Sequence, residues 1–98
     1  MTLAEALSAA AAGLEGIEQR ESADGSIEWS VDGRPFAACR DARAEFRLPP
    51  AIARAALGTA DTGGSVRGTD WVSFTPAELD RFSLDRATAW LASARRHA

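Results

Sequence analysis

The dipeptide Asp32-Gly33 separates two segments in which apolar and polar residues alternate, and it limits the fold more than any other feature of the sequence. On its N-terminal side Ile27, Trp29 and Val31 recur at every second position, which is the period of a half-buried strand. An Asp-Gly pair between two such segments is typical of a two-residue hairpin turn of type I′. The sequence therefore predicts an antiparallel hairpin centred on residues 32–33.

A two-residue turn also predicts a register. It places Trp29 opposite Phe36 and Ile27 opposite Ala38, so these side chains would share one apolar face. The next alternating segment, residues 43–48, joins this face if residues 40–42 form a three-residue loop. The reverse face is then mostly polar, and it would carry Glu28, Ser30, Pro35, Ala37, Cys39, Arg43, Glu45 and Arg47.

Helical patterns flank this strand meander. Thr2 with Glu5 three residues later is typical of a capping box, and apolar residues at helical spacing continue to Leu14. A short helix is predicted over 51–57, a loop over 59–68 and a strand over 69–74. Thr75 and Glu78 repeat the capping-box spacing, so we expect a short helix there, restarting at residue 83 as the final helix.

The order helix, three strands, helix, strand, helix predicts an α+β fold of two layers. We expect an antiparallel sheet of about four strands with the helices packed on one face. A chain of 98 residues forms one domain, residues 1–98, because separate cores develop only in much longer chains. Ala accounts for 22 of the residues, so the core must be small.

The charges argue against a generally basic protein. There are 14 acidic and 11 basic residues, a net charge of −3, and every basic residue is Arg. This balance disfavours a polybasic membrane anchor and strong nucleic-acid binding. The charge is uneven, however: residues 1–33 sum to −6 and residues 34–98 to +3. The Ala- and Arg-rich composition favours a bacterial origin.

One Cys and one His exclude several classes of site. Tetrahedral zinc needs four ligands of this kind, and Cys39 with His97 supplies two. A single Cys forms no internal disulfide. The first residues lack the basic character of a secretory signal, and no apolar run is long enough to span a bilayer. We therefore expect a cytoplasmic protein with no metal, no cofactor and no membrane association.

Four blocks of the sequence resemble the MmcQ/YjbR family of small bacterial proteins: IEWSVDGRPFAACRD, AEFRLPPAIARAAL, GTDWVSFTP and DRATAWLASARRHA. The resemblance covers most of the chain after about Gly16. It implies an α+β fold with an antiparallel sheet, and members are often labelled DNA-binding. Arg34 replaces the usual Lys, and Ser93-Ala94 replaces a usual Ser-Tyr, so any role of that hydroxyl is absent. The blocks EFRLP and WVSF also resemble a small domain family named after luciferase, a name that implies no luciferase chemistry in so short a chain.

Three residues are the candidates for a site. Cys39 faces Arg43 in the predicted register, and a nearby cation lowers a thiol pKa, although a structural Cys is the simpler interpretation. Arg43 and Arg47 share the polar face with small residues and could receive phosphate or carboxylate. The alternative is that Glu45, which lies between them, neutralises the pair, or that another element covers the face.

We expect a non-enzymatic binding or interaction protein, with Arg43, Arg47 and Cys39 as the binding residues and no assigned catalytic residue. The resemblance makes a nucleic acid, or another anionic partner, the leading specific hypothesis. A small enzyme that uses Cys39 is the first alternative. A structural dimerisation module is the second, and a homodimer stays open.

Overall fold

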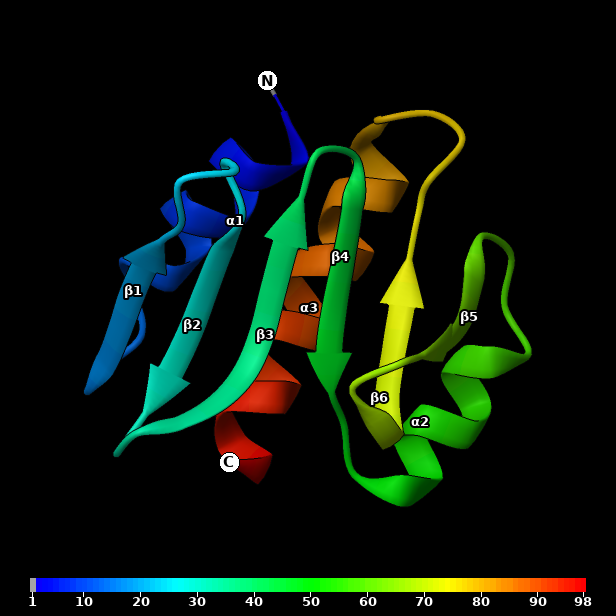
Figure 1. The fold of residues 1–98 in the computed structure, drawn as a ribbon. Helices are drawn as coiled ribbons and strands as arrows, with labels where there is room; N and C mark the ends of the chain where they lie inside the picture. The colour runs from blue at the N-terminus through cyan, green and yellow to red at the C-terminus, as the bar shows by residue number, and fades with distance from the viewer. Residues whose placement is uncertain (1) are drawn as a thin grey trace.

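The computed structural model describes residues 2–98, which form three helices and one six-stranded antiparallel sheet. The strands lie in the order β1-β2-β3-β4-β6-β5 (Figure 1). The elements in chain order are α1 (Leu3–Ala11), β1 (Ile17–Glu21), β2 (Ile27–Val31), β3 (Arg34–Arg40), β4 (Arg43–Arg47), α2 (Pro50–Leu57), β5 (Thr62–Ser65), β6 (Gly68–Phe74) and α3 (Arg81–His97).

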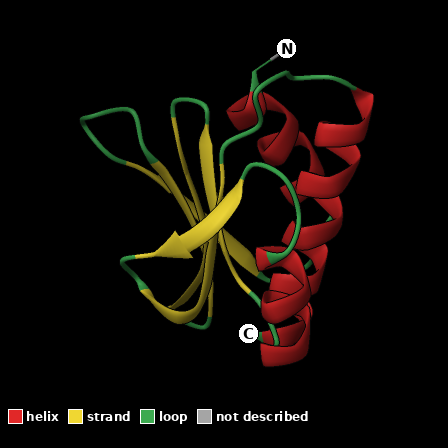
Figure 2. Ribbon diagram, turned by 90° about the vertical axis from the view of Figure 1, so that its right-hand side faces the viewer, coloured by secondary structure: helices red, strands yellow, loops and turns green. Residues whose placement is uncertain are grey.

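All three helices lie on one side of the sheet, as Figure 2 shows. This confirms the α+β class and the two layers, but the sheet has six strands, and not about four. Two edge strands were not predicted. β1 is exposed at four of its five positions, so it shows no alternation, and β5 contains Gly63 and Gly64 in the segment predicted as a loop. Such strands are stabilised by pairing with a neighbouring strand. Their sequences show no alternation of apolar and polar residues from which they could be predicted.

The core lies between the sheet and the helices. Trp90 of α3 meets the rings of Phe46 and Phe74 edge-on, with centroids 6.1 and 5.3 Å apart. The other inward positions of α3 are small or aliphatic, including the fully buried Ala87 and Leu91. Small side chains let the helix approach the sheet closely, which is how an Ala-rich sequence closes a core with few large residues.

The hairpin turn at Asp32-Gly33 is confirmed. Both residues have positive φ, 51° and 78°, as a type I′ turn requires. The predicted register holds for Val31 and Ser30 next to the turn. It is wrong from Trp29 back to Ile27, because β3 contains a β-bulge. Trp29 pairs with Ala37, and Phe36 is the extra residue. Pro35 cannot donate to the ladder, and the bulge places both Phe36 and Ala37 in the core.

The bulge inverts the alternation in the rest of β3. Cys39 pairs with Ile27 and Ala44 on the helix-covered face, so its predicted place on the polar face, opposite Arg43, is wrong. Ala37, also predicted on the polar face, likewise lies on the helix-covered face, and Ala38 lies on the opposite face. The predicted three-residue loop is also wrong, because Arg40 pairs with Arg43 and only residues 41–42 form the turn.

The helix predicted at Thr75 does not form. The backbone N–H of Thr75 donates to the Asp61 carbonyl at 2.9 Å, and the N–H of Ala77 donates to Asp61 Oδ2 at 3.1 Å. These contacts hold the segment in an irregular conformation. The helix begins instead at Arg81, where the Asp80 carboxylate accepts from the N–H of Ser83 at 2.8 Å and caps the first turn.

Burial of Phe36 at the bulge predicts a large stability loss when its ring is removed. Phe36 is fully buried, so Phe36→Ala should lower the free energy of unfolding by about 3 to 5 kcal/mol. Val66→Ala is the control, because Val66 is 99% exposed and its loss should cost less than about 0.5 kcal/mol. Urea unfolding of both variants measures the difference. Equal stabilities would contradict the placement of Phe36 in the core.

Candidate functional site on the open face of the sheet

The side of the sheet opposite the helices carries no helix in residues 2–98, and we call it the open face (Figure 2). Its positions follow from the register, because they alternate with the buried ones. The open face comprises Glu18, Arg20, Glu28, Ser30, Pro35, Ala38, Arg40, Arg43, Glu45, Arg47, Trp71 and Ser73. The predicted polar face is therefore present, with Ala37 and Cys39 removed from it.

Arg67 crosses the open face from the turn between β5 and β6. Its Nε donates to Glu45 Oε1 at 3.2 Å, and its Nη1 donates to Glu28 Oε2 at 3.3 Å. Its guanidinium also lies 5.2 Å from the centre of the Trp71 ring. Trp71 is only 8% exposed although no helix covers it. Arg67 thus joins β6, β4 and β2 and shields the one large aromatic side chain of the open face.

Gly68 allows the turn to come this close. A Cβ at this position would lie 3.3 Å from Trp71 Cδ1 and 3.3 Å from Asp70 Oδ1. Glu45 receives a second contact from the same hairpin, the hydroxyl of Ser65. Glu45 is therefore paired with residues of the β5–β6 hairpin, and not with the two arginines on its own strand.

The structure does not bring Arg43 and Arg47 together. They lie at opposite ends of β4, about 13 Å apart along the strand. Arg47 is occupied, because its Nε donates to Asp70 Oδ2 at 2.8 Å, and this hydrogen bond lowers the pKa of the Asp70 carboxyl. Arg43 is exposed and has no ion pair within residues 2–98. The role of either residue in binding stays a prediction.

Arg43 instead has another arginine directly opposite it. Arg40 and Arg43 are cross-strand partners on either side of the two-residue turn, and both are exposed. Arg40 has one ion pair, with Asp24 at 3.9 Å. Like charges at directly opposed positions repel each other, so this pair is unfavourable unless an anion lies between the two groups. Sequence reasoning missed Arg40 because it assigned this residue to a loop.

Cys39 is a poor nucleophile in this position. Its side chain is 2% exposed, and its Sγ faces the Asp41 carbonyl at 3.9 Å. Burial, and then the nearby Asp41 carboxylate, raise the pKa of the Cys39 thiol to about 11. The group is thus a neutral thiol at pH 7, and the expected activation by Arg43 has no basis in the geometry.

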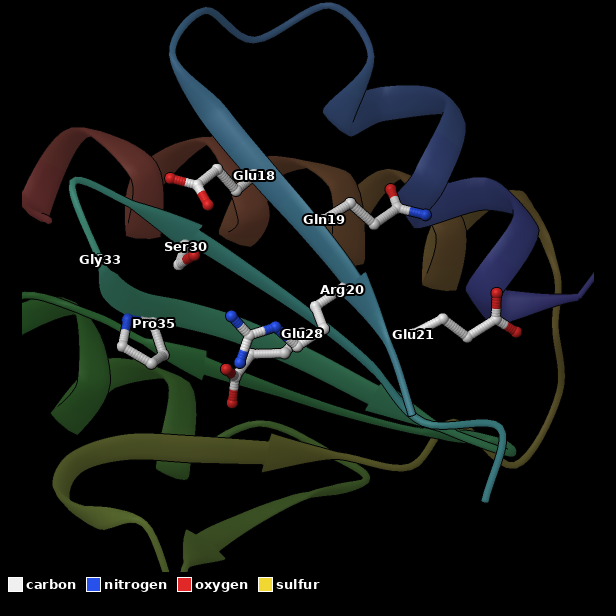
Figure 3. Close-up of a pocket in the computed structure, with 8 residues that line it drawn as sticks. All are labelled: Glu18, Gln19, Arg20, Glu21, Glu28, Ser30, Gly33 and Pro35. Carbon is white, nitrogen blue, oxygen red and sulfur yellow. The ribbon is translucent and has the colours of Figure 1, made fainter. Parts of the chain in front are cut away.

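A polar hollow of about 400 Å³ lies at the β1 end of the open face. Figure 3 shows its lining, in which Arg20 and Glu28 extend toward Pro35. Glu18 and Glu28 line the hollow with Arg20, whereas Glu21 extends toward α1 in Figure 3, so acidic groups outnumber the single Arg. This end of the open face disfavours an anion, in contrast to the end with Arg40 and Arg43.

Within residues 2–98, no three His, Cys, Asp or Glu side chains gather as potential metal ligands. No helix in that range is long and apolar enough to cross a membrane.

Comparison with known proteins adds no relative: no family model, no curated protein and no solved structure matches the chain. The resemblance to MmcQ/YjbR proteins stays a prediction.

The Cys39 pKa predicts a pH dependence of stability. The folded value of about 11 exceeds the ordinary value of 9.0, so the unfolded chain loses this proton first. The free energy of unfolding is therefore undiminished below pH 9 and should fall by about 2 kcal/mol as the pH rises to 11. The chain contains no Lys and no Tyr, the two other side-chain types that ordinarily titrate near pH 10. Cys39→Ala should lack this fall, and a wild-type curve that is flat from pH 9 to 11 would contradict the burial argument.

Removal of the Arg67 side chain should expose Trp71. Arg67→Ala loses two partly exposed ion pairs, worth about 1 kcal/mol, and uncovers the indole ring. We expect stronger acrylamide quenching of tryptophan fluorescence, and Trp71→Phe should abolish the increase. Arg54→Ala is the matched control, since Arg54 is exposed and has no ion pair within residues 2–98. Unchanged quenching in Arg67→Ala would show that Arg67 does not cover the ring.

Proposed function

We propose that the protein is a non-enzymatic binding protein, and that an anionic partner contacts Arg40 and Arg43 at one end of the open face. The observation that carries the proposal is the direct opposition of these two exposed arginines across the β3–β4 hairpin. An isolated protein gains nothing from placing two cations at paired positions. A phosphate or carboxylate between them turns the repulsion into two charge-assisted contacts.

The ion pairs of the neighbouring arginines favour this end of the open face. Arg47 and Arg67 are held by acidic partners, so they are not free to bind an anion. Arg43 has no such partner within residues 2–98, and the Arg40 pair with Asp24 is long and mostly solvent-exposed. A pair of this kind contributes little and is easily exchanged for a ligand.

In its specific form, the proposal is that the partner is a nucleic acid. The DNA-binding label of the resembled family and the sum of +3 over residues 34–98 support this choice. The net charge of −3 limits the number of phosphate contacts. We therefore expect binding of the non-specific kind, with a Kd in the micromolar range or weaker.

Fluorescence anisotropy with labelled duplex DNA at low salt tests this proposal. Binding should weaken as salt rises, because counterions are released from the phosphates. Arg43→Gln should reduce the affinity about tenfold, and Arg40→Gln by a similar factor.

Arg54→Gln is the matched control, since it removes one exposed Arg far from the hairpin and should leave the affinity within about twofold. Arg47→Gln should also have a small effect, because Arg47 is held by Asp70. Absence of DNA binding at protein concentrations of about 100 µM would overturn the proposal. Equal losses in Arg43→Gln and Arg54→Gln would overturn the assignment of the site.

Catalysis through Cys39 is disfavoured as the alternative function. The thiol is buried on the helix-covered face, and its raised pKa keeps it protonated. A substrate would have to enter the core to reach it.

A further inference from the structure

β1 is an edge strand whose outer side meets no other element in residues 2–98 (Figure 1). The opposite edge strand, β5, is short, contains two glycines and is packed beside α2. The two edges therefore differ in their capacity to accept another strand. Only β1 offers five consecutive paired residues with an uncovered edge.

The hairpin between β1 and β2 determines which backbone groups face outward. The N–H of Ser22 donates to the Ser26 carbonyl at 2.8 Å, so Ser22 points toward β2. Successive residues of a strand point their N–H and C=O to opposite sides, and the register of β1 with β2 has no shift. Arg20 and Glu18 therefore also bond β2, whereas Ile17, Gln19 and Glu21 present unpaired N–H and C=O groups along the edge.

These outward groups are symmetric about Gln19. In a two-fold antiparallel pairing, Gln19 meets Gln19 of a second copy, and Ile17 meets Glu21 of that copy in both directions. Each of these three pairs exchanges two backbone hydrogen bonds, which makes six in all. No residue of β1 has to leave its pairing with β2.

The charges select this register. Centred on Gln19, it places Glu18 opposite Arg20 of the second copy, and this ion pair forms twice by symmetry. A shift of the centre to residue 18 would oppose two glutamates, and a shift to residue 20 would oppose two arginines. Both of these registers are repulsive. Glu18 and Arg20 are exposed and make no ion pair within residues 2–98, so their charges are available.

We infer that β1 is a self-association site and that its partner is a second copy of this chain. The result is an isologous dimer in which the two sheets join into one antiparallel sheet of twelve strands. The polar hollow beside β1 then adjoins its symmetry mate, because Glu18 and Arg20 line it. Five residues per copy make a small interface, so the dimer belongs to the weak, transient class.

Sedimentation velocity between 10 and 500 µM measures the dimer. Wild-type protein should shift from monomer toward dimer over this range at low salt. Arg20→Glu places acidic groups at both positions, and Glu18→Arg places basic groups at both. Each variant should weaken self-association at least tenfold, while circular dichroism shows an unchanged fold because both side chains are exposed.

Mixing the two variants is the decisive control. In a mixed pair, every acidic group of one copy faces a basic group of the other, so a one-to-one complex should form although each variant alone is monomeric. The double variant Glu18→Arg with Arg20→Glu should likewise dimerise like the wild type. Wild type that stays monomeric at 500 µM would overturn the inference and would mean that the charges of β1 protect the edge from pairing. Single variants that dimerise normally, or a mixture that stays monomeric, would also overturn it.

Discussion

The β-bulge at Phe36 decides which residues of the central strand β3 lie inside and which lie outside. Without it, Trp29 would face Phe36, and every later residue of β3 would point to the other side of the sheet. Two adjacent residues, Phe36 and Ala37, enter the core at the bulge. After the bulge, Ala38 and Arg40 lie on the open face and Cys39 lies on the helix-covered face, so this one irregularity decides what β3 contributes to each side of the sheet.

The two faces of the sheet are stabilised by different interactions. On the helix side, aromatic side chains and closely packed Ala residues form an apolar core. On the open face no helix supplies apolar cover, and Trp71 is shielded by a guanidinium that is itself held by two carboxylates. Arg67 of the β5–β6 hairpin therefore covers Trp71 as a third layer would. Arg67 and its partner Glu45 on β4 thus have a structural role. Charged residues on this face cannot be assumed to be free for a ligand.

Much of the fold could be predicted from the sequence, because strong local signals decided those parts. Asp32-Gly33 gave the first turn, and the capping box of Thr2 gave the first helix. The bulge was missed although a local signal was present, because Pro35 stands beside Phe36 and Pro occurs within strands mainly at edges and bulges. Asp61 similarly prevented a helix start at Thr75 through contacts 14 and 16 residues away in sequence.

The same limitation applied to the candidate site. Arg43 was found, since its position on β4 depends only on local alternation. Arg40 was missed, because its pairing depends on the length of the turn at residues 41–42. That turn contains no Gly, and Asp41 supplies the positive φ of 53° instead. Asp tolerates this conformation better than most residues, so the chain forms a two-residue turn here without Gly.

The distribution of paired and unpaired charges connects the proposed binding site and the proposed self-association site. In the middle of the open face, Arg67 and Arg47 are held by Glu28, Glu45 and Asp70. On the same face, the charged side chains with no ion pair or only a long one within residues 2–98 lie at the β3–β4 turn and along β1. At the turn the two opposed charges are alike, which is the basis for proposing an anionic partner there. Along β1 they alternate in sign, so an identical strand in antiparallel orientation satisfies them. The pattern of signs is therefore the reason for proposing a different kind of partner at each place.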